Sequence, residues 1–491
     1  MTDVLLGVDI GTASSKGIAV TADGSVLATA VRQHDLSTPH PGWAEHDAER
    51  VWWADFTSIV SELTAATEHP IVGLGVSGIG PCLVPTDADG TPLRPAILYG
   101  VDTRAGKEIT ELTSRYGTEQ IIARCGSPLT SQAVGPKLLW LRGNEPEVWD
   151  RTRRFYMASS LIVHRLTGTY VLDHHSASQC TPLYDQAEHT WISEWAEDIA
   201  PGLQLPDLAW PGDVVGEVQT DIARDLGLPP GTPVIAGTID AWAEAVSAGV
   251  TAPGDVMLMY GTTMFMVEVL AQRRTWPTLW GTVGVVPDTF NLAAGMATSG
   301  AITDWLRRLT GSEFPTLVEE AAQAGIGADG LLMLPYFAGE RTPLFDADAR
   351  GVIVGLTTRH DRGHLYRAAL EATAFGVRHN LEAMREAGGE DRRLVGVGGG
   401  TKGGLWTQIV SDVLGEEQQL PRETIGACYG DAMLAAEAVG AASRTSSWNP
   451  IETVVRPDSA AHELYDQRYR MYRDLYPATA TIAHQLAELQ G

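Results

Sequence analysis

Two stretches of the chain share one pattern, in which an apolar run, a short polar turn and a second apolar run follow one another. In the first, Leu5–Ile10 and Gly17–Val20 flank the turn GTASSK at residues 11–16. In the second, the apolar stretch Val256–Val269 is interrupted by GTT at residues 261–263. β-rich runs around a small polar turn are typical of a strand, a tight turn and a returning strand. The pattern therefore predicts two similar hairpins, one in each half of the chain.

Three further patterns complete the outline. The apolar run Leu394–Val397 leads through the glycine turn at residues 398–401 into a predicted helix over Leu405–Leu414. Apolar positions three or four residues apart predict a long helix over His364–Arg385, and a terminal helix is predicted over Glu463–Tyr476. Strands alternating with helices in this way indicate an α/β protein.

Composition and charge narrow the possible functions. The chain has 491 residues, of which 44% are hydrophobic and 20% charged, as expected for a globular protein of two or three domains. A formal charge of −26 argues against nucleic acid or an anionic membrane as partner. The four cysteines have neither metal-site spacing nor a disulfide pattern, and the first residues do not resemble a signal peptide. We expect a cytoplasmic protein.

The first turn has the chemistry of a phosphate site. Gly11 lets the backbone approach an anion, successive N–H groups can form a nest, and Thr12 and Ser14 add hydroxyl donors. Lys16 supplies a point charge for a phosphate, and Asp9 offers a hard oxygen to Mg²⁺. The alternative is an ordinary hairpin with a solvated lysine. The glycine spacing matches neither a Walker A loop nor a dinucleotide fingerprint.

Related turns follow in the second half. Gly261, Thr262 and Thr263 repeat the plan of the first hairpin, and Gly300 begins a helix whose N–H groups suit a phosphate or a ribose. A third turn contains Gly399, Gly400 and Thr401, and it can lie flat against a purine ring. Two half-molecules, each with a phosphate-binding hairpin facing one cleft, are the plan of the actin-like ATPases. The predicted fold class is α/β, with two actin-like (ribonuclease H-like) domains and an ATP-binding cleft between them.

Asp240 is the acid with the clearest candidate role. It follows the apolar strand Val234–Ile239 and precedes a helix of small residues over 241–248. A hydroxyl that attacks ATP needs an acceptor for its proton, and we expect Asp240 to be that base. The simpler interpretation is a helix N-cap, and both roles are compatible.

Other candidates are less specific. A buried strand over Ile71–Val76 ends in a loop of small residues that includes Gly80 and Pro81, and such loops bind ligands in α/β sheets. Asp102 and Arg104 either contact a polyol or form a structural ion pair. His40 and His46 are either metal ligands or solvated loop residues.

The ordered set of motifs resembles the FGGY family of carbohydrate kinases over nearly the whole chain. The matching segments are GVDIGTASSK (7–16), GWAEHD (42–47), PAILYGVDTR (95–104), PKLLWL (136–141), AGTIDA (236–241), YGTT (260–263), LPYFAGERTP (334–343), ARGVIVGL (349–356), GVGGGTKGGLWTQIVSD (396–412) and GDAMLAA (430–436). The resemblance implies that two actin-like domains close over ATP, Mg²⁺ and a small sugar. It also assigns Asp9 to the metal, Asp240 to the catalytic base, and Gly404, with Gly300, Gly399 and Gly400, to the nucleotide.

Within that family the likeness is greatest to the xylulose kinases, with residues 1–250 expected to bind sugar and residues 251–491 to bind nucleotide. One segment departs from their pattern: a Gln-Met-His-Gly sequence is replaced by residues Ile79–Cys82. The resemblance implies phosphorylation of a ketopentose, with ribulose, fuculose, gluconate or glycerol as alternative acceptors and a homodimer as a further expectation. A non-catalytic, nucleotide-switched sugar-binding protein is the alternative of another class. Asp431, in place of a small residue, is expected either to alter contacts with ribose or to cap its helix.

Overall fold

The computed structural model describes residues 2–442 and 448–490, which divide into two compact units. The first unit consists of Met1–Thr251, Leu270–Asn291 and Ile425–Asn449, and the second of Ala252–Val269, Leu292–Thr424 and Pro450–Gly491. The chain leaves the first unit at Thr251, next to the border expected at residue 250. The division does not fall at one point of the sequence, because two later segments of the chain belong to the first unit.

Both predicted hairpins are confirmed. Strands β1 (Val4–Ile10) and β2 (Ser14–Thr21) pair antiparallel, with Ile10 opposite Ser15. Strands β16 (Asp255–Tyr260) and β17 (Met264–Leu270) pair in the same way, with Tyr260 opposite Met264. Each turn therefore occupies only the few residues between two strands whose apolar side chains are buried.

A seven-stranded mixed sheet forms the centre of the first unit. Its strand order is β13-β14-β5-β1-β2-β3, with β15 also paired to β5. Besides β1 and β2 it contains β3 (Val26–Gln33), β5 (Ile71–Gly78), β13 (Val214–Glu217), β14 (Pro233–Ile235) and β15 (Thr238–Ile239). Strand β5 runs parallel to β1, and β14 and β15 run parallel to β5. The carboxyl ends of these strands therefore meet at one edge of the sheet.

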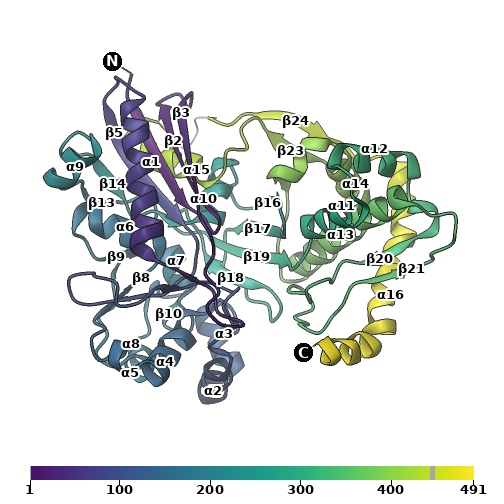
Figure 1. Cartoon of the computed structure of the whole chain (residues 1–491), viewed down its shortest axis with the longest axis horizontal. Helices are drawn as coiled ribbons and strands as arrows, with labels where there is room; N and C mark the ends of the chain where they lie inside the picture. The colour runs from purple at the N-terminus through teal and green to yellow at the C-terminus, as the bar shows by residue number, and fades with distance from the viewer. Residues whose placement is uncertain (1, 443–447, 491) are drawn as a thin grey trace. The chain divides into compact units, whose positions relative to one another are not determined.

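Helices α1 (Ala54–Ala65) and α15 (Ala427–Ala438) cover opposite faces of this sheet (Figure 1). A Cβ at Gly17 would lie 2.2 Å from Ile59 of α1, whereas a Cβ at Gly7 would lie 1.9 Å from the Cys428 carbonyl oxygen of α15. Gly17 is paired with Val8, and successive residues of a strand face opposite sides. Because both glycines lack a side chain, the two helices approach the sheet closely.

The remaining elements of the first unit are short strands and helices, and one of the strands, β18, pairs with β19 of the other seven-stranded sheet. The short strands are β4 (Glu45–His46), β6 (Val84–Thr86), β7 (Ala96–Ile97), β8 (Arg154–Tyr156), β9 (Val171–Asp173), β10 (Tyr184–Asp185), β11 (Thr190–Trp191), β12 (Asp207–Ala209) and β18 (Trp280–Val283). The helices are η1 (Ala48–Trp53), α2 (Gly106–Tyr116), α3 (Thr118–Cys125), α4 (Val134–Asn144), α5 (Pro146–Trp149), α6 (Ala158–Thr167), α7 (His174–Ser178), α8 (Ser193–Ile199), α9 (Thr220–Leu226) and α10 (Asp240–Ser247).

The second unit has its own sheet, in which β19, β17, β16, β22, β23 and β24 are neighbours in that order. The strands not yet given are β19 (Phe290–Met296), β20 (Leu332–Leu334), β21 (Val352–Val354), β22 (Arg393–Val397), β23 (Gln418–Pro421) and β24 (Ile451–Val455). The helices are α11 (Gly300–Thr310), α12 (Phe314–Ala324), η2 (Ala328–Gly330), α13 (Arg362–Glu386), η3 (Gly399–Gly403), α14 (Leu405–Leu414) and α16 (Ser459–Gln490).

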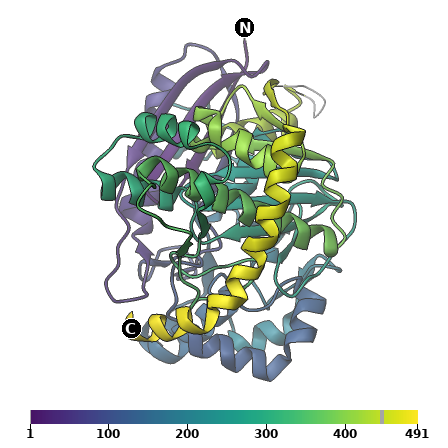
Figure 2. The same cartoon turned by 90° about the vertical axis from the view of Figure 1, so that its right-hand side faces the viewer.

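Two long helices of the second unit compare differently with their predictions. Helix α13 matches its predicted range to within two residues, and the Asp361 side chain caps it by accepting a hydrogen bond from His364 N at 3.2 Å. Helix α16 extends well beyond the predicted end at Tyr476. Pro477, the residue after that predicted end, lies inside the helix, and Figure 2 shows that the helix changes direction along its length.

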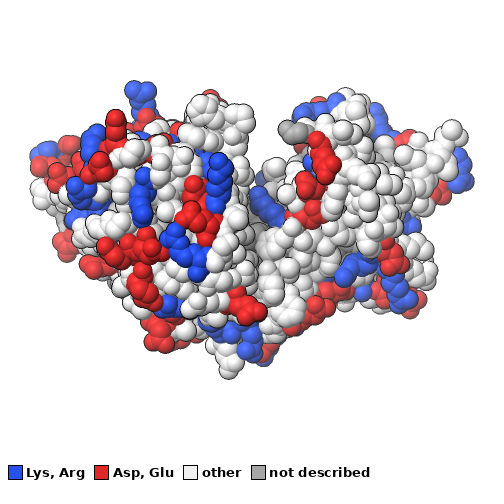
Figure 3. All heavy atoms as spheres, turned by 90° about the horizontal axis from the view of Figure 1, so that it is seen from below, with Lys and Arg blue, Asp and Glu red and all other residues white. Residues whose placement is uncertain are grey.

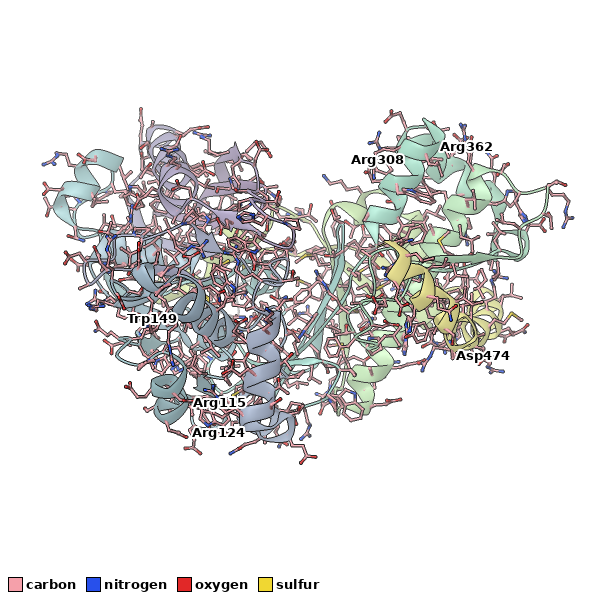
Figure 4. All side chains as sticks on the ribbon, turned by 60° about the horizontal axis from the view of Figure 1, so that its bottom comes forward. Arg115, Arg124, Trp149, Arg308, Arg362 and Asp474 are labelled. Carbon is pink, nitrogen blue, oxygen red and sulfur yellow. The ribbon has the colours of Figure 1, made fainter. Side chains whose placement is uncertain are left out.

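Charged side chains of both signs are interspersed on the surface in Figure 3. Arg115 of α2 and Arg124 of α3, both labelled in Figure 4, form ion pairs with Asp198 and Asp185 at 2.7 and 2.9 Å. In the second unit Arg362 pairs with Glu320 at 2.6 Å. Exposed pairs of this kind contribute little to stability. None of the described helices has the length and apolarity required to span a membrane.

The close packing of α15 on β1 makes a direct prediction. We expect Gly7→Ala to destabilise the protein by ~1–3 kcal/mol or more, because the new methyl group overlaps the backbone of α15. Gly143→Ala is the matched control, since Gly143 lies in α4 with no atom within 4 Å of an added Cβ. Thermal unfolding should show a lower Tm for Gly7→Ala and an unchanged or slightly higher Tm for the control. Equal Tm values for the two variants would contradict the packing.

Candidate active site

The turn of the first hairpin is closed by its own backbone. Gly11 N donates to the Ser14 carbonyl oxygen at 3.1 Å, and a Cβ at Gly11 would lie 2.5 Å from that oxygen, so only glycine fits. The Thr12 hydroxyl is 3.1 Å from the Tyr99 hydroxyl. The exposed Lys16 stands opposite Asp9 in the β1–β2 ladder. The predicted phosphate and metal residues of the first unit are thus neighbours around one turn.

Strand register brings Asp240 to the same edge of the sheet. Thr238 and Ile239 pair with Ser77 and Gly78 of β5, and Ser77 in turn pairs with Asp9. Asp240 is therefore the residue that follows β15 at the edge where Asp9 lies. Its carboxylate accepts a hydrogen bond from Ala241 N at 2.8 Å. The N-cap interpretation is wrong, because Asp240 is the first residue of α10 and Ile239 is its N-cap.

Four carboxyl groups, from Asp9, Asp240, Glu244 and Asp431, interact electrostatically here, and we call them the acid cluster. Burial raises the pKa of Asp240 to about 6 and that of Glu244 to about 7. Burial and then the Asp240 charge hold the pKa of Asp9 well above its usual range, while Lys16 acts in the opposite direction. Acids with perturbed pKa values around a base candidate are typical of a catalytic site.

Asp431 belongs to this cluster and not to a ribose site. It lies inside α15, which is part of the first unit, and its side chain is fully buried. The Ser77 hydroxyl donates to Asp431 Oδ2 at 2.6 Å. Neither of the two expected roles, a ribose contact or a helix cap, describes this arrangement. The sequence did not show it because the partners are 354 residues apart.

The loop after β5 has the small residues that the sequence suggested. Its Gly80–Pro81 peptide bond is cis, and a Cβ at Gly80 would lie 2.6 Å from the Ile239 side chain, next to Asp240. Cys82 is fully buried, which raises the pKa of its thiol to about 12. Lys137 of α4 is also buried, and its pKa is lowered to about 8 by that burial.

Asp102 and Arg104 form a buried ion pair. Both side chains are 0% exposed, and their closest atoms are 2.7 Å apart. Asp102 Oδ2 also accepts from Ala44 N at 2.7 Å, and the Arg104 guanidinium lies 3.8 Å from the centre of the Trp43 ring. Of the two alternatives for this pair, the arrangement favours the structural ion pair.

The glycine turns of the second unit are joined to one another. Gly300 N and Ala301 N donate to the carbonyl oxygens of Gly261 and Thr262, each at 3.0 Å. These N–H groups of α11, expected to bind a phosphate or ribose directly, instead hold the hairpin. A Cβ at Gly300 would lie 2.5 Å from the Gly261 oxygen, so glycine permits this contact.

The third turn adjoins the same hairpin. A Cβ at Gly398 would lie 2.7 Å from the Tyr260 carbonyl oxygen, and one at Gly400 would lie 2.7 Å from the Trp406 ring. Thr401 donates from its hydroxyl to the Gly398 carbonyl at 2.8 Å. Gly399 and Gly404 have no atom within 4 Å of an added Cβ. These last two glycines leave room for a ligand to approach the backbone closely.

The described side chains do not form a metal site from protein ligands alone. Among residues 2–442 and 448–490 there is no group of three or more His, Cys, Asp or Glu arranged to hold a metal ion. The His46 Nδ1 accepts a hydrogen bond from Trp52 Nε1 at 3.1 Å, so a metal role for this histidine has no support.

Comparison with known proteins agrees with this architecture, a two-unit α/β protein with an acid-lined hairpin in one unit and glycine turns in the other. Models of the N-terminal and C-terminal domains of the FGGY family of carbohydrate kinases match residues 4–247 and 256–439. The chain belongs to the FGGY family of carbohydrate kinases. It is accordingly an ATP-dependent sugar kinase with the fold of that family.

Individual relatives extend over almost the whole chain. The chain is 30% identical to a xylulose kinase of Staphylococcus epidermidis, covering 99% of this chain and 98% of the relative. It is 29% identical to a glycerol kinase of Beutenbergia cavernae, covering 93% and 92%. The crystal structure of xylulose kinase from Rhodospirillum rubrum is 33% identical, with a TM-score of 0.89 and coverage of 98% and 100%.

Sequence reasoning missed Glu244 and Ser77, and it did not place Asp431 in the acid cluster. Glu244 lies four residues after Asp240, and helix periodicity places such residues on one face, so this signal was present. Asp431 and Ser77 had no local signal, because only the return of α15 to the first unit brings them together.

Asp431 provides a test of the cluster by linkage. Its pKa is raised well above the usual value, mainly by burial, so between the unfolded and folded pKa values the folded state binds more protons. Stability then falls as pH rises, by up to about 1.4 kcal/mol per pH unit for one proton. Asp431→Asn keeps the acceptor for Ser77 but has no proton to lose.

We therefore expect the Tm of Asp431→Asn to exceed that of the unmodified protein by an amount that grows from pH 5 to pH 8. The measurement is differential scanning fluorimetry of both proteins without divalent cations. A Tm difference that stays constant or shrinks with rising pH would show that Asp431 is an ordinary ionised carboxylate.

Proposed function

We propose that this kinase transfers the γ-phosphate of ATP to a hydroxyl of a ketopentose, with xylulose as the first candidate. The observation that carries the proposal is Asp240, whose half-buried carboxyl group stands at the sheet edge shared by Asp9 and the Gly11 turn. Relatives and solved structures named xylulose kinase support the choice of sugar.

Asp240 acts as the general base in this proposal. Its carboxylate accepts the proton of the sugar hydroxyl as that oxygen bonds to the γ-phosphorus, and the bond from the phosphorus to the ADP oxygen breaks. A base with a pKa of about 6 is ionised at neutral pH and still basic enough to accept a proton. Such a residue contributes typically ~10²–10⁴-fold in rate.

The hairpin turn and Lys16 are assigned to the phosphates. The N–H groups of residues 11–14 can surround a phosphate oxygen, and the hydroxyls of Thr12 and Ser14 add donors. Lys16 is exposed, so its ammonium group can reach an anion and stabilise the charge that develops in transfer. In the second unit the open backbone at Gly399, Thr401 and Gly404 is assigned to the nucleotide, and Gly261, Thr262, Thr263, Gly300 and Gly400 to its support.

Mg²⁺ fits the residues that are present. Asp9 Oδ1 is buried and, within the described part of the chain, has no hydrogen-bond partner. Mg²⁺ in phosphate-transfer sites is held by one or two carboxylates together with substrate phosphates and waters, so a larger set of protein ligands is not required. Asp9 would hold the ion, which would neutralise phosphate charge when bound.

The loop Gly80–Cys82 bears on the acceptor. A glycine, a proline and a buried cysteine offer fewer hydrogen-bonding groups than the segment expected for a xylulose kinase, and unpaired polar contacts can change specificity by about 10⁴ or more. Ribulose, fuculose, gluconate and glycerol are therefore alternative acceptors, and each belongs in the substrate test.

The four buried thiols, none of them in a disulfide, support a cytoplasmic location. The homodimer stays a prediction.

The acceptor is tested with a panel of sugars and polyols in a coupled assay of ADP release, with identification of the phosphorylated product. We expect the highest kcat/KM for xylulose. A higher kcat/KM for another acceptor would refute the choice of xylulose without affecting the kinase mechanism.

Asp240→Asn tests the base. We expect kcat to fall ~10²–10⁴-fold, while ADP affinity stays within threefold. In the unmodified enzyme kcat/KM should fall as pH drops through about 6, because protonated Asp240 cannot accept the proton. Retention of full activity by the variant, or a flat profile between pH 5 and 8, would exclude Asp240 as the base.

Lys16→Met tests the phosphate contact. Loss of a charge-assisted contact should raise the KM for ATP about 10-fold or more with little change in the KM for sugar. Lys107→Met, which alters an exposed lysine of α2, is the matched control and should leave both constants unchanged. Equal increases in both KM values for Lys16→Met would contradict the assignment.

A further inference from the structure

His34 lies directly behind the phosphate-binding turn of the first unit. Its backbone N donates to the Ala13 carbonyl oxygen at 3.1 Å, immediately after strand β3. Its ring Nε2 is 3.0 Å from the Gly11 carbonyl oxygen, and its Nδ1 is 2.8 Å from Asp55 Oδ2 on α1. The side chain is only 7% exposed. One histidine thus holds the turn at two backbone positions.

The partners of His34 determine its protonation. A carbonyl oxygen can only accept, so Nε2 must carry a proton. Asp55 Oδ2 also accepts a hydrogen bond from the Ser15 hydroxyl at 2.8 Å, so this oxygen acts as an acceptor. Nδ1 must therefore donate as well. A ring that donates from both nitrogens is an imidazolium, and the contact to Asp55 is a shielded ion pair.

A second histidine beside it stays neutral. The His46 ring of β4 contacts the His34 ring edge to face, with centroids 5.1 Å apart. Burial and then the charge on His34 lower the pKa of His46 to about 4, against the opposing effects of the Thr12 backbone and Asp55.

We propose that His34 is a positioning residue for the phosphates of ATP. It holds the Gly11 carbonyl oxygen away from the phosphate site and places a positive charge behind the turn. A turn can direct its N–H groups at an anion only if its carbonyl oxygens are held away from that anion, and His34 supplies the donor that does this. The inference rests on the proposed phosphate role of residues 11–16. It adds a residue from outside every motif that the resemblance contains.

The test compares His34→Gln and His34→Phe with the unmodified full-length enzyme, and uses His69→Gln as matched control because His69 is exposed in the same unit. KM for ATP, KM for the sugar and kcat are measured, and ADP binding is measured by calorimetry without sugar. We expect both His34 variants to raise the ATP KM and the ADP Kd about 10- to 100-fold, the range for loss of a hydrogen bond to a charged group.

The same variants should leave the KM for the sugar within twofold. The control should match the unmodified enzyme. An ATP KM and ADP Kd within twofold of the unmodified enzyme would overturn the proposal. Equal increases in the ATP and sugar KM values would also overturn it, because they would show a merely structural role.

Two further results distinguish failure of the His34 proposal from failure of the proposed function. NMR of the unmodified protein should show the His34 Nε2–H hydrogen-bonded to the Gly11 carbonyl oxygen, and the absence of that hydrogen bond would overturn the proposal even if the variants fail to fold. A protein that phosphorylates no acceptor in the panel would refute the proposed function alone. ADP binding would then still decide whether His34 positions a phosphate.

Discussion

The contact between the backbone of α15 and the strands β1 and β5 is the constraint on which the active-site region depends. Gly7 and Gly75 have no side chain at the points where the carbonyl oxygens of Cys428 and Asp431 meet the sheet, and a Cβ would come within 1.9 and 2.4 Å of these oxygens. Gly430 allows the same approach to the Ala243 carbonyl of α10, at 1.9 Å. Three glycines therefore fix a helix, a strand pair and the helix that carries Asp240 against one another.

This packing explains why carboxyl groups with raised pKa values gather in one place. Asp9 and Ser77 lie on the paired strands, Asp240 begins α10, and Asp431 is brought in from the far end of the chain by α15. Collecting buried acids opposes stability, because each must hold a proton or be ionised away from water. The fold offsets this by close packing and by the hydroxyl of Ser77, and the same environment makes Asp240 a stronger base than an exposed aspartate.

Much of this organisation could be predicted from local sequence. The two hairpins, the helix α13 and Asp240 at a strand-to-helix junction follow from periodicity and turn residues, which act over a few positions. The roles predicted for Asp431 were wrong because helix α15 packs on the first unit, which is formed mainly by the other end of the sequence. No local sequence pattern indicates this packing. Helix α16 continues past Pro477 because Ala483 and Ala487 remain buried, so tertiary packing outweighs the lost hydrogen bond. Asp102 and Arg104 gave an ambiguous signal, since only burial distinguishes an ion pair from a sugar contact.

The central claim is that the Asp240 carboxylate faces the hydroxyl that receives the phosphate. The most direct measurement is a crystal structure of the enzyme with its sugar and a non-hydrolysable ATP analogue. The account predicts one sugar hydroxyl within hydrogen-bonding distance of the Asp240 carboxylate, roughly 2.6–3.2 Å. A sugar bound with every hydroxyl beyond that reach of Asp240, or with another acid of the cluster in its place, would contradict the account.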